Sequence, residues 1–577
     1  MNDWQQYANH MVRKLNPVES DPYHLADFGP KIQRDTVHAL VIDAGSTGSR
    51  MHVYEYEPRL LTTPADVSLA ASGRKLTYPS TNSLWTERLS PGINTLASIE
   101  NDTELTAAVT SYLTPLLDYA RSILAEKQTM FSHFPIYFRA TGGMRALKPP
   151  DRIRIMNSVR TVLDDVAFNP FAFTHEFARV ISGEEESVFG WTAVNFLMNT
   201  LLNNTAGQGT VVNPSLTYGA LDMDGASVQI SFFDPQQDIM SSLFKLQIGS
   251  SRHWNIYAHS YLKFGTFSAL ERLNARLYHN SDPYSLLVYN PCSPGRYFYN
   301  FTSNIFFGSN DIEYQNQTFY TVNMANPNDK GDYYKCADVV LQLLELSSNA
   351  FCIFSHNSDC TFAGVYQPKI PAENVNNFAE FLAFGDFHYV WKILQLDTRS
   401  NLRKLQEKSI DLCNMSIDEL LVYNESSRLN ISTTEQLVES CFRAVFAFQM
   451  LHIGLGFALD SNITATNVIN GQKVSWALGS VLYEINTRPW IYVDSNAKSA
   501  ETPAQNLNWT AICIAGLLFY VIAIPICLSF RKRRMRRRVS DYPKIGTESE
   551  VSNGMESTDN PSTEVVSNNV NSYGSIS

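Results

Sequence analysis

Two segments of the chain carry the same pattern of hydrophobic and polar positions. In residues 41–57, VIDAGSTGSRMHVYEYE, an apolar run ends in Asp43, small residues follow, and apolar and polar residues then alternate. Residues 219–233, GALDMDGASVQISFF, repeat this plan around Asp222, about 180 residues later. Alternation with a period of two is typical of strands, so each segment predicts two strands joined by a small-residue turn.

The first turn is longer than a hairpin requires, because two residues such as Asn-Gly suffice. Residues 45–49 therefore expose several backbone N–H groups, which suit an anion such as phosphate. Two such hairpins facing each other would hold a phosphate chain from both sides and bring Asp43 and Asp222 toward one divalent cation. Ordinary glycine-containing β-turns are the alternative, but the repetition after an aspartate favours a phosphate site.

The rest of the pattern predicts alternating strands and helices. A helix is expected at 104–127, and FPIYFRATGGMRAL (134–147) predicts a strand, a turn and a helix start. The helix at 181–202 begins with three glutamates, which favours the N-terminal end of the helix dipole. Residues 378–396 and 441–457 also predict helices. Residues 281–360 are interpreted as insertions and 541–577 as a disordered tail.

Composition indicates a large, acidic, globular protein. A chain of 577 residues is too long for one core, so two or more domains are expected. The hydrophobic content of 44% excludes a disordered chain. The net charge is −11 although residues 531–538, RKRRMRRR, carry seven basic side chains. The rest of the chain is therefore more acidic still, which argues against nucleic acid as the main partner.

An uncharged segment, WTAICIAGLLFYVIAIPICLSF (509–530), directly precedes that basic run. As a helix it would reach roughly 33 Å, enough to cross a bilayer core of about 30 Å. A buried core helix is the alternative, but its length and flanking charge favour a membrane span with the basic run in the cytosol. Residues 1–508 would then lie in a lumen or outside the cell.

Cysteines and glycosylation triplets agree with that placement. Six cysteines precede the segment, which suits three disulfides in an oxidising compartment: Cys292, Cys336, Cys352, Cys360, Cys413 and Cys441. The sequence alone leaves their pairing open. Acceptor triplets for N-glycosylation begin at Asn101, Asn203, Asn300, Asn316, Asn414, Asn424, Asn430, Asn462 and Asn508. Because residues 1–37 contain no apolar signal segment, we expect a signal anchor upstream of this sequence.

Five segments resemble, in order, the five conserved regions of the apyrase family, the nucleoside triphosphate diphosphohydrolases. They are DAGSTGSR, ATGGMRAL, ISGEEESVFGW, LDMDGASVQI and WALGSVLYEIN, and the resemblance covers roughly residues 38–490. CTFAGVYQP and FLAFGDFHYVWKIL also resemble family segments. The LDM triplet, LHIGLGF and the C-terminal apolar segment are similar to the Golgi and endolysosomal nucleoside diphosphatase branch.

The resemblance implies an α/β fold with two ribonuclease H-like lobes of the actin, Hsp70 and hexokinase type, a central cleft and a C-terminal transmembrane helix. The implied organisation is a stalk (1–37), lobe I (38–179 and 465–492), lobe II (180–464), a linker (493–508), the membrane helix (509–530) and a cytosolic tail (531–577).

The resemblance also implies roles for individual residues. Glu186, five residues before Trp191, would be the base that takes a proton from water; without the family, the three glutamates would be interpreted as a solvated helix start. Phosphates would be bound by Ser46, Thr47, Gly48, Ser49, Gly225, Ala226 and Ser227. Thr141 and Arg145 would neutralise the terminal phosphate, although a structural ion pair is the alternative for Arg145. Gln229 and Ser227 would orient the water, and Asp43 and Asp222 would hold Mg²⁺ or Ca²⁺ through its water shell.

Three further expectations come from the family. Phe384, Phe387 and Tyr389 are candidates for stacking on the base, with core packing as the alternative. Trp476 is expected to pack where the lobes meet. The disulfides are expected to join Cys292 to Cys336, Cys352 to Cys360, and Cys413 to Cys441.

Two positions depart from the family pattern. Asp224 stands where the fourth region usually has glycine, which puts a carboxylate beside the phosphates and removes the freedom of glycine to adopt a positive φ. Gly142 replaces the usual alanine in the second region. The leading hypothesis is a lumenal, metal-dependent hydrolase of UDP, GDP and also triphosphates on a Golgi or endolysosomal membrane, with the cell surface as the alternative location. The competing hypotheses are a non-catalytic nucleotide-binding protein of the same fold and a sugar kinase.

Overall fold

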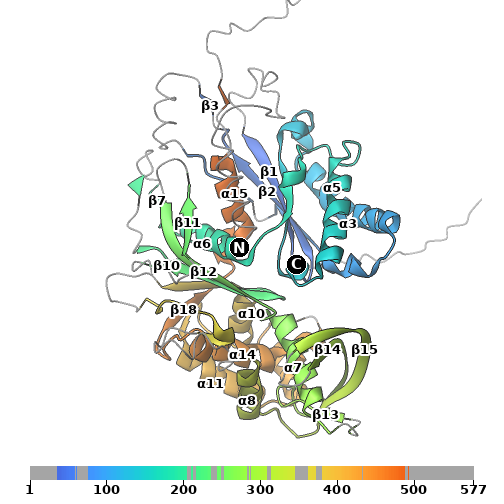
Figure 1. The fold of residues 1–577 in the computed structure, drawn as a ribbon. Coiled ribbons are helices and arrows are strands. Elements are labelled where there is room, and N and C mark those ends of the chain that lie inside the picture. Colours follow the sequence, from blue (N-terminus) through green and yellow to red (C-terminus); the bar gives the residue numbers. More distant parts are fainter. Residues whose placement is uncertain are drawn as a thin grey trace, which may run out of the picture. The chain divides into compact units, whose positions relative to one another are not determined.

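The computed structural model describes residues 36–492 apart from 59, 62–75, 83, 204–209, 212–215, 235–242, 249–252, 283–284, 286, 308–312, 345–360, 372–379, 430, 432 and 488–490 (Figure 1). Within this part of the chain no helix is both long and apolar enough to span a bilayer. The predicted span at 509–530 and the cytosolic tail lie outside the described residues, as does nearly all of the stalk.

The first sheet has five strands in the order β4-β2-β1-β5-β6. The strands β1 (Val37–Ala44), β2 (Ser49–Tyr56) and β4 (Thr86–Leu89) form an antiparallel meander. β5 (Ile136–Ala140) runs parallel to β1, and β6 (Ala178–Val180) runs parallel to β5. All of β1 is buried, as expected for a central strand covered on both faces. Helices α3 (Asp102–Ile123) and α5 (Pro149–Asp164) lie on one side of it and α15 (Trp476–Thr487) on the other (Figure 1).

The second sheet repeats this topology with an extra strand at each edge. Its order is β11-β12-β10-β9-β16-β18-β17. β9 (Gly219–Met223), β10 (Ser227–Phe233) and β12 (His253–Leu262) are antiparallel, whereas β16 (Phe381–Gly385) and β18 (Asn462–Ala465) continue in parallel. β11 (Leu243–Gln247) and β17 (Arg399–Asn401) are the edge strands. Each of the two strand-turn-strand segments of the sequence therefore forms the first two strands of one sheet, β1 and β2 or β9 and β10, and the two sheets are equivalent. The two predicted hairpins are confirmed.

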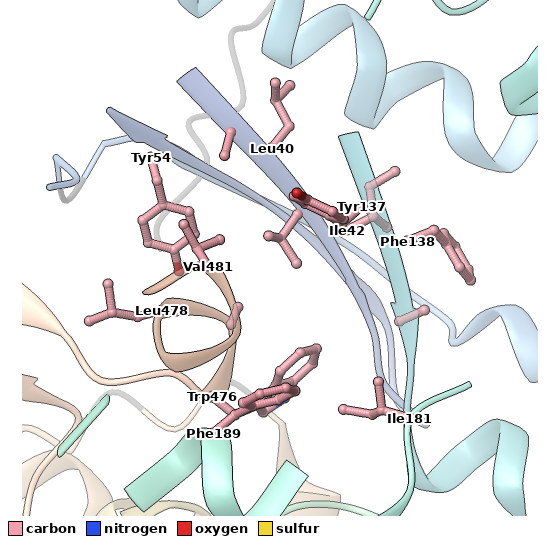
Figure 2. Close-up of a cluster of buried hydrophobic side chains, with 14 of the residues drawn as sticks. Leu40, Ile42, Tyr54, Tyr137, Phe138, Ile181, Phe189, Trp476, Leu478 and Val481 are labelled. Atoms are coloured by element: carbon pink, nitrogen blue, oxygen red, sulfur yellow. The ribbon is translucent and has the colours of Figure 1, made fainter. Parts of the chain in front are cut away.

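Helices α6 (Gly183–Leu197) and α15 lie between the sheets and touch each other. α6 packs on β9, β10 and β12, whereas α15 packs on β1 and β2. A Cβ atom on Gly479 would lie only 1.9 Å from the Phe189 carbonyl oxygen, so this close helix crossing requires glycine. Figure 2 shows Trp476 and Phe189 together in the core beside Leu478 and Val481, in agreement with the packing role expected of Trp476.

Helices and a small sheet build the outer part of the second lobe. The helices are α7 (Thr266–His279), α8 (Tyr333–Leu343), α10 (Asp386–Ile393), α11 (Leu402–Cys413), α12 (Ile417–Ser426), α13 (Thr434–Val438) and α14 (Ser440–Gln449), which continues as a π-helical turn at Met450–Gly454. The predicted insertion contains β13 (Leu287–Tyr289), β14 (Tyr297–Phe307) and β15 (Glu313–Asn326). Short elements complete the fold: α4 (Gly142–Arg145), β3 (Leu60–Leu61) with β21 (Ile491–Tyr492), β7 (Leu202–Asn203) with β8 (Thr210–Val211), and β19 (Val468–Ile469) with β20 (Gln472–Lys473).

The helix predicted over 378–396 is wrong at its N-terminal half. Residues 381–385 form β16, and α10 begins only at Asp386. β16 lies between β9 and β18, so both of its faces are buried and its sequence shows no alternation. Gly385 separates the strand from the helix with φ +67°, a conformation that favours glycine.

Two of the predicted disulfides are present. Cys292 is bonded to Cys336, and Cys413 to Cys441. The third predicted pair, Cys352 with Cys360, lies outside the described residues.

Candidate active site

The two repeated hairpins have the same register around their aspartates. Asp43 pairs with Arg50 across β1 and β2, and Asp222 pairs with Gln229 across β9 and β10. The turns close with equivalent backbone hydrogen bonds, from Gly45 N–H to the Gly48 oxygen (2.9 Å) and from Asp224 N–H to the Ser227 oxygen (3.0 Å). Each turn thus comprises four residues, 45–48 and 224–227. Arg50 of the first hairpin occupies the position of Gln229 in the second.

The turns face each other across a pocket. A Cβ atom on Gly225 would lie 2.9 Å from Ser46 Oγ and 2.8 Å from Thr47 Cγ2, so glycine permits this approach. The pocket is lined by Asp43, Gly45, Ser46, Thr47, Gly48, Arg50, Arg88, Thr141, Gly142, Asp224, Gly225, Ala226 and Ser227. Ser49, in contrast, is a buried residue of β2 whose hydroxyl accepts a hydrogen bond from Tyr112 (3.0 Å). It is the one predicted phosphate-binding residue that does not line the pocket.

The second conserved region completes the pocket at the end of β5. The backbone N–H of Thr141 donates to the Ala44 oxygen (3.1 Å), which places Thr141 beside the first turn. A Cβ atom on Gly142 would lie 2.9 Å from Ser227 Oγ, and one on Gly143 would lie 2.6 Å from Ser46 Cα. The glycine that replaces alanine at position 142 therefore allows the second turn to come this close.

Glu186 lies directly behind this pocket, at the first turn of α6. Ser182 and Glu185 form a capping box that fixes where the helix begins and hence where Glu186 points. Glu186 is 1% exposed, and its Oε2 accepts hydrogen bonds from Arg145 Nη2 (2.7 Å) and Gln229 Nε2 (3.1 Å). Its Oε1 accepts no hydrogen bond from any described residue. One oxygen is therefore held in place while the other remains available as a proton acceptor.

Ser227 joins Glu186 to the pocket wall. Its Oγ accepts from Gln229 Nε2 (2.8 Å) and Arg145 Nη2 (3.2 Å), so three side chains from α4 and β10 meet beside the glutamate. Ser260 Oγ on β12, which the sequence did not indicate, also accepts from Gln229 Nε2 (3.2 Å). Burial raises the pKa of Glu186, while the Arg145 guanidinium opposes this shift. A carboxylate of raised pKa is a better proton acceptor near neutral pH.

Four acidic side chains interact at the site. Burial raises the pKa of Asp43 to about 7, with Arg50 opposing the shift and Asp224 adding to it. The pKa of Asp222 is raised well above its ordinary value by burial and then by Asp224, Glu186 and Asp43. Among the described residues no three acidic, histidine or cysteine side chains are arranged to grip one metal ion directly. The carboxylates of Asp43 and Asp222 are oxygen ligands of the kind that a hard divalent cation prefers.

Asp224 is compatible with the backbone of its turn. It is not among the described residues with a positive φ, so the turn does not require glycine there. Burial and then Glu186 raise the pKa of its carboxyl to about 7, while Arg50 opposes the shift. The turn therefore loses nothing by having aspartate instead of glycine at position 224. The remaining difference is the negative charge that Asp224 places beside the phosphates.

The predicted base-stacking aromatics separate into two groups. Phe384 is 3% exposed on β16, and Phe387 is fully buried in the second core, so neither ring face is open to a base. The structure therefore corrects the base-stacking prediction for Phe384 and Phe387, because both rings pack in the hydrophobic cores. Tyr389 on α10 is 49% exposed and remains a candidate.

Three exposed or half-buried side chains beside the turns were missed at the sequence level. Phe267 is 47% exposed, lies against Gly225, and has the Arg443 guanidinium 5.0 Å from its ring centre. Arg50 and Arg88 line the pocket, and Arg88 Nη2 donates to Thr47 Oγ1 (3.2 Å). Only Arg50 carried a signal, because it ends DAGSTGSR at the position that Gln229 occupies in the repeat.

Relatives of this chain are known. The sequence pattern of the GDA1/CD39 (nucleoside phosphatase) family matches residues 31–506. The chain is 26% identical to probable apyrase 3 of Arabidopsis thaliana over 78% of its own length and 83% of that protein. It is also 26% identical to the Golgi apyrase of Saccharomyces cerevisiae over 77% of its length and 69% of that protein. The crystal structure of a nucleoside triphosphate hydrolase from Neospora caninum shares the fold, with a TM-score of 0.53, 15% identity, and coverage of 84% of this chain and 97% of that one.

The duplicated sheets, the facing turns and these relatives agree on the actin- and Hsp70-like nucleotide phosphatase fold. The chain therefore belongs to the GDA1/CD39 family and is a nucleoside phosphatase.

Proposed function

We propose that the protein hydrolyses nucleoside diphosphates such as UDP and GDP, and also nucleoside triphosphates, to monophosphate and inorganic phosphate. The observation that carries this proposal is the meeting of Glu186, Arg145, Ser227 and Gln229 directly behind two facing phosphate-type turns. In this proposal the backbone N–H groups and hydroxyls of both turns bind the phosphates, and Thr141 and Arg145 neutralise the terminal one.

The chemical step needs one proton acceptor and one oriented water. The water oxygen forms a bond to the terminal phosphorus while the bond from phosphorus to the bridging oxygen breaks, and the leaving nucleotide keeps that bonding electron pair. Glu186 accepts the proton that the water loses, since its Oε1 has no hydrogen-bond donor among the described residues. Ser227 and Gln229 orient the water. They are already hydrogen-bonded to each other, and Ser227 also accepts from Arg145 while Gln229 donates to Glu186.

A divalent cation fits this arrangement. Mg²⁺ or Ca²⁺ held through its waters by Asp43 and Asp222 would supply positive charge next to the phosphates. The raised pKa of both aspartates supports this assignment, because buried carboxylates that repel each other are stabilised by a nearby cation.

The proposed location is the lumenal side of a Golgi or endolysosomal membrane. Two disulfides and the acceptor triplets for glycans support an oxidising, glycosylating compartment. The apolar segment at 509–530 with its basic flank supports a C-terminal membrane anchor. Sugar transfer in such a compartment leaves UDP and GDP, which this enzyme would convert to monophosphates.

Phosphate release by the detergent-solubilised full chain tests the proposal. UDP, GDP, ADP and the matching triphosphates are supplied with Mg²⁺ or Ca²⁺, and EDTA is the control. Metal-dependent release of phosphate from UDP or GDP supports the proposal. Tight nucleotide binding without release of phosphate from any of these nucleotides would instead favour a non-catalytic protein in which Asp224 prevents turnover.

A further inference from the structure

One row of charged residues crosses the whole first sheet. Arg88, Arg50, Asp43, Arg139 and Arg179 are successive register partners from β4 to β6. Residues that lie opposite each other on neighbouring strands point to the same face of a sheet. The row therefore presents four arginines and one aspartate to one side.

The two halves of this row have different partners. Arg139 Nη2 donates to Glu484 Oε1 of α15 (2.7 Å), and Arg179 Nη1 donates to Glu185 Oε2 of α6 (2.8 Å). Neither Arg50 nor Arg88 has a carboxylate of the described residues within ion-pair distance. Arg139 and Arg179 are therefore paired with carboxylates, whereas Arg50 and Arg88, which line the pocket, form no ion pair with a described carboxylate.

Arg50 and Arg88 face each other directly across the β2–β4 ladder. Like charges at such positions destabilise strand pairing. Both side chains also line the pocket between the phosphate-type turns, and Arg88 is tied to the first turn through Thr47. A repulsive pair at this position suits an anionic ligand that separates and neutralises the two charges.

Lys473 of β20 adds a third cation to this pair. Burial, and then Arg50 and Arg88, lower the pKa of its ammonium group. Burial and Arg50 also lower the pKa of Arg88, while Tyr389 and Asp386 of α10 act in the opposite direction. These interactions put Lys473 near Arg50 and Arg88, and Arg88 near Tyr389 and Asp386 of α10.

We propose that Arg50, Arg88 and Lys473 form an anion subsite that holds the innermost phosphate of a nucleoside triphosphate. This inference rests on the proposed function. The two turns hold the terminal and the next phosphate, so a diphosphate is fully bound by them. A triphosphate has one more phosphate, and Arg50 and Arg88 line the pocket beside the turns, with Arg88 near Tyr389, the remaining candidate for stacking on the base. The subsite thus decides how well triphosphates are accepted relative to diphosphates.

Steady-state kinetics with UDP and UTP test the subsite in the full-length protein. Arg88→Gln and Lys473→Gln are suitable because both residues reach the solvent, although their charged ends are partly buried. The double variant should raise the KM for UTP by about 10-fold, because hydrogen bonds to a charged phosphate are lost, and should raise the KM for UDP much less. Lys408→Gln is the matched control, because Lys408 is an exposed cation on α11 whose partner is Asp411.

The outcomes separate this inference from the proposed function. Wild-type turnover of both nucleotides with an equal change of KM for UDP and UTP, or with no change, overturns the subsite and leaves the hydrolase intact. If the wild-type protein hydrolyses neither nucleotide, the proposed function fails, and calorimetry with tripolyphosphate and pyrophosphate becomes the test. A selective loss of tripolyphosphate binding in the double variant would still support the subsite, and equal binding by both proteins would reject it.

Discussion

Arg145 and Glu186 form a largely buried ion pair, with 2.7 Å between Nη2 and Oε2, although Arg145 belongs to α4, which follows β5 of the first sheet, and Glu186 to α6. The ion pair predicted as the structural alternative for Arg145 is therefore present, and its contact with the terminal phosphate stays a prediction. The guanidinium keeps Glu186 in place, and it also donates to Ser227 at the pocket wall. A terminal phosphate bound there would compete with Glu186 for Arg145, which would leave the glutamate a stronger base.

Glu186→Gln should abolish turnover while nucleotide binding remains nearly intact. Glutamine has a similar shape but cannot accept the proton, and loss of a general base typically costs about 10²–10⁴-fold in rate. Phosphate release and nucleotide binding by calorimetry measure the two effects separately. Glu184→Gln, two residues earlier in α6, is the control. A Glu186→Gln enzyme that kept more than about a third of the wild-type rate would exclude Glu186 as the base.

Arg145→Met should move the acidic limb of the kcat/KM profile to higher pH. Arg145 opposes the raised pKa of Glu186, so its removal raises that pKa further, and the base is then ionised only at higher pH. The KM should also rise, because a phosphate contact is lost. A pH–rate profile between about pH 5 and 9 measures this. Arg403→Met, at an exposed pair with Asp460, is the control. An unshifted acidic limb would show that Arg145 does not act on the base.

Asp224→Gly should lower the KM more than it raises kcat. Two like charges about 4 Å apart repel by about 1 kcal/mol in water and about 4 kcal/mol at intermediate dielectric, in ground state and transition state alike. At saturating Mg²⁺ a decrease in KM of at least about 5-fold is expected. The backbone tolerates the change, because Asp224 does not adopt a positive φ. Loss of activity in the glycine variant would instead make Asp224 a working ligand.

In the absence of bound metal, the stability of the protein should decrease as the pH rises. The pKa values of Asp43 and Asp224 are about 7 in the folded protein and 3.8 in the ordinary, unfolded case. Between these values the folded state binds more protons than the unfolded state, so stability falls as pH increases through this window. In EDTA the Tm should be higher near about pH 5 than near about pH 8, and Mg²⁺ should raise it more at the higher pH. An Asp43→Asn, Asp224→Asn variant with the same pH dependence would contradict this account.

Cys352 should be bonded to Cys360, the pair that lies outside the described residues. The other four cysteines before residue 509 are already joined in two pairs, so these two are the remaining partners in that part of the chain. Non-reducing peptide mapping of the full chain should recover one peptide pair that contains both. A free thiol at either position, or a bond to another cysteine, would contradict the prediction.

The sequence by itself determined those helices, strands and turns whose sequence patterns span only a few consecutive residues. The alternation around Asp43 and Asp222 specified two hairpins, because a strand, a closing turn and a register all lie within about a dozen residues of chain. The three glutamates at 184–186 likewise indicated a helix start, and α6 begins at Gly183, within two residues of the predicted position. The family motifs added which of these residues belong to the site.

Only the tertiary structure decided which distant residues meet. Glu186 contacts Arg145 and Gln229 because two sheets and α6 pack around one pocket, a fact that no local period contains. β16 was predicted as helix because burial on both faces erases alternation. Core packing, the alternative given for Phe384 and Phe387, was decided by how β16 and α10 pack. The sequence also could not predict that Arg50 and Arg88 face each other, since this depends on how β4 pairs with β2. Packing and strand pairing bring together residues that are far apart in the sequence. They therefore decide which side chains act together in the site, whereas the local pattern only supplies those side chains.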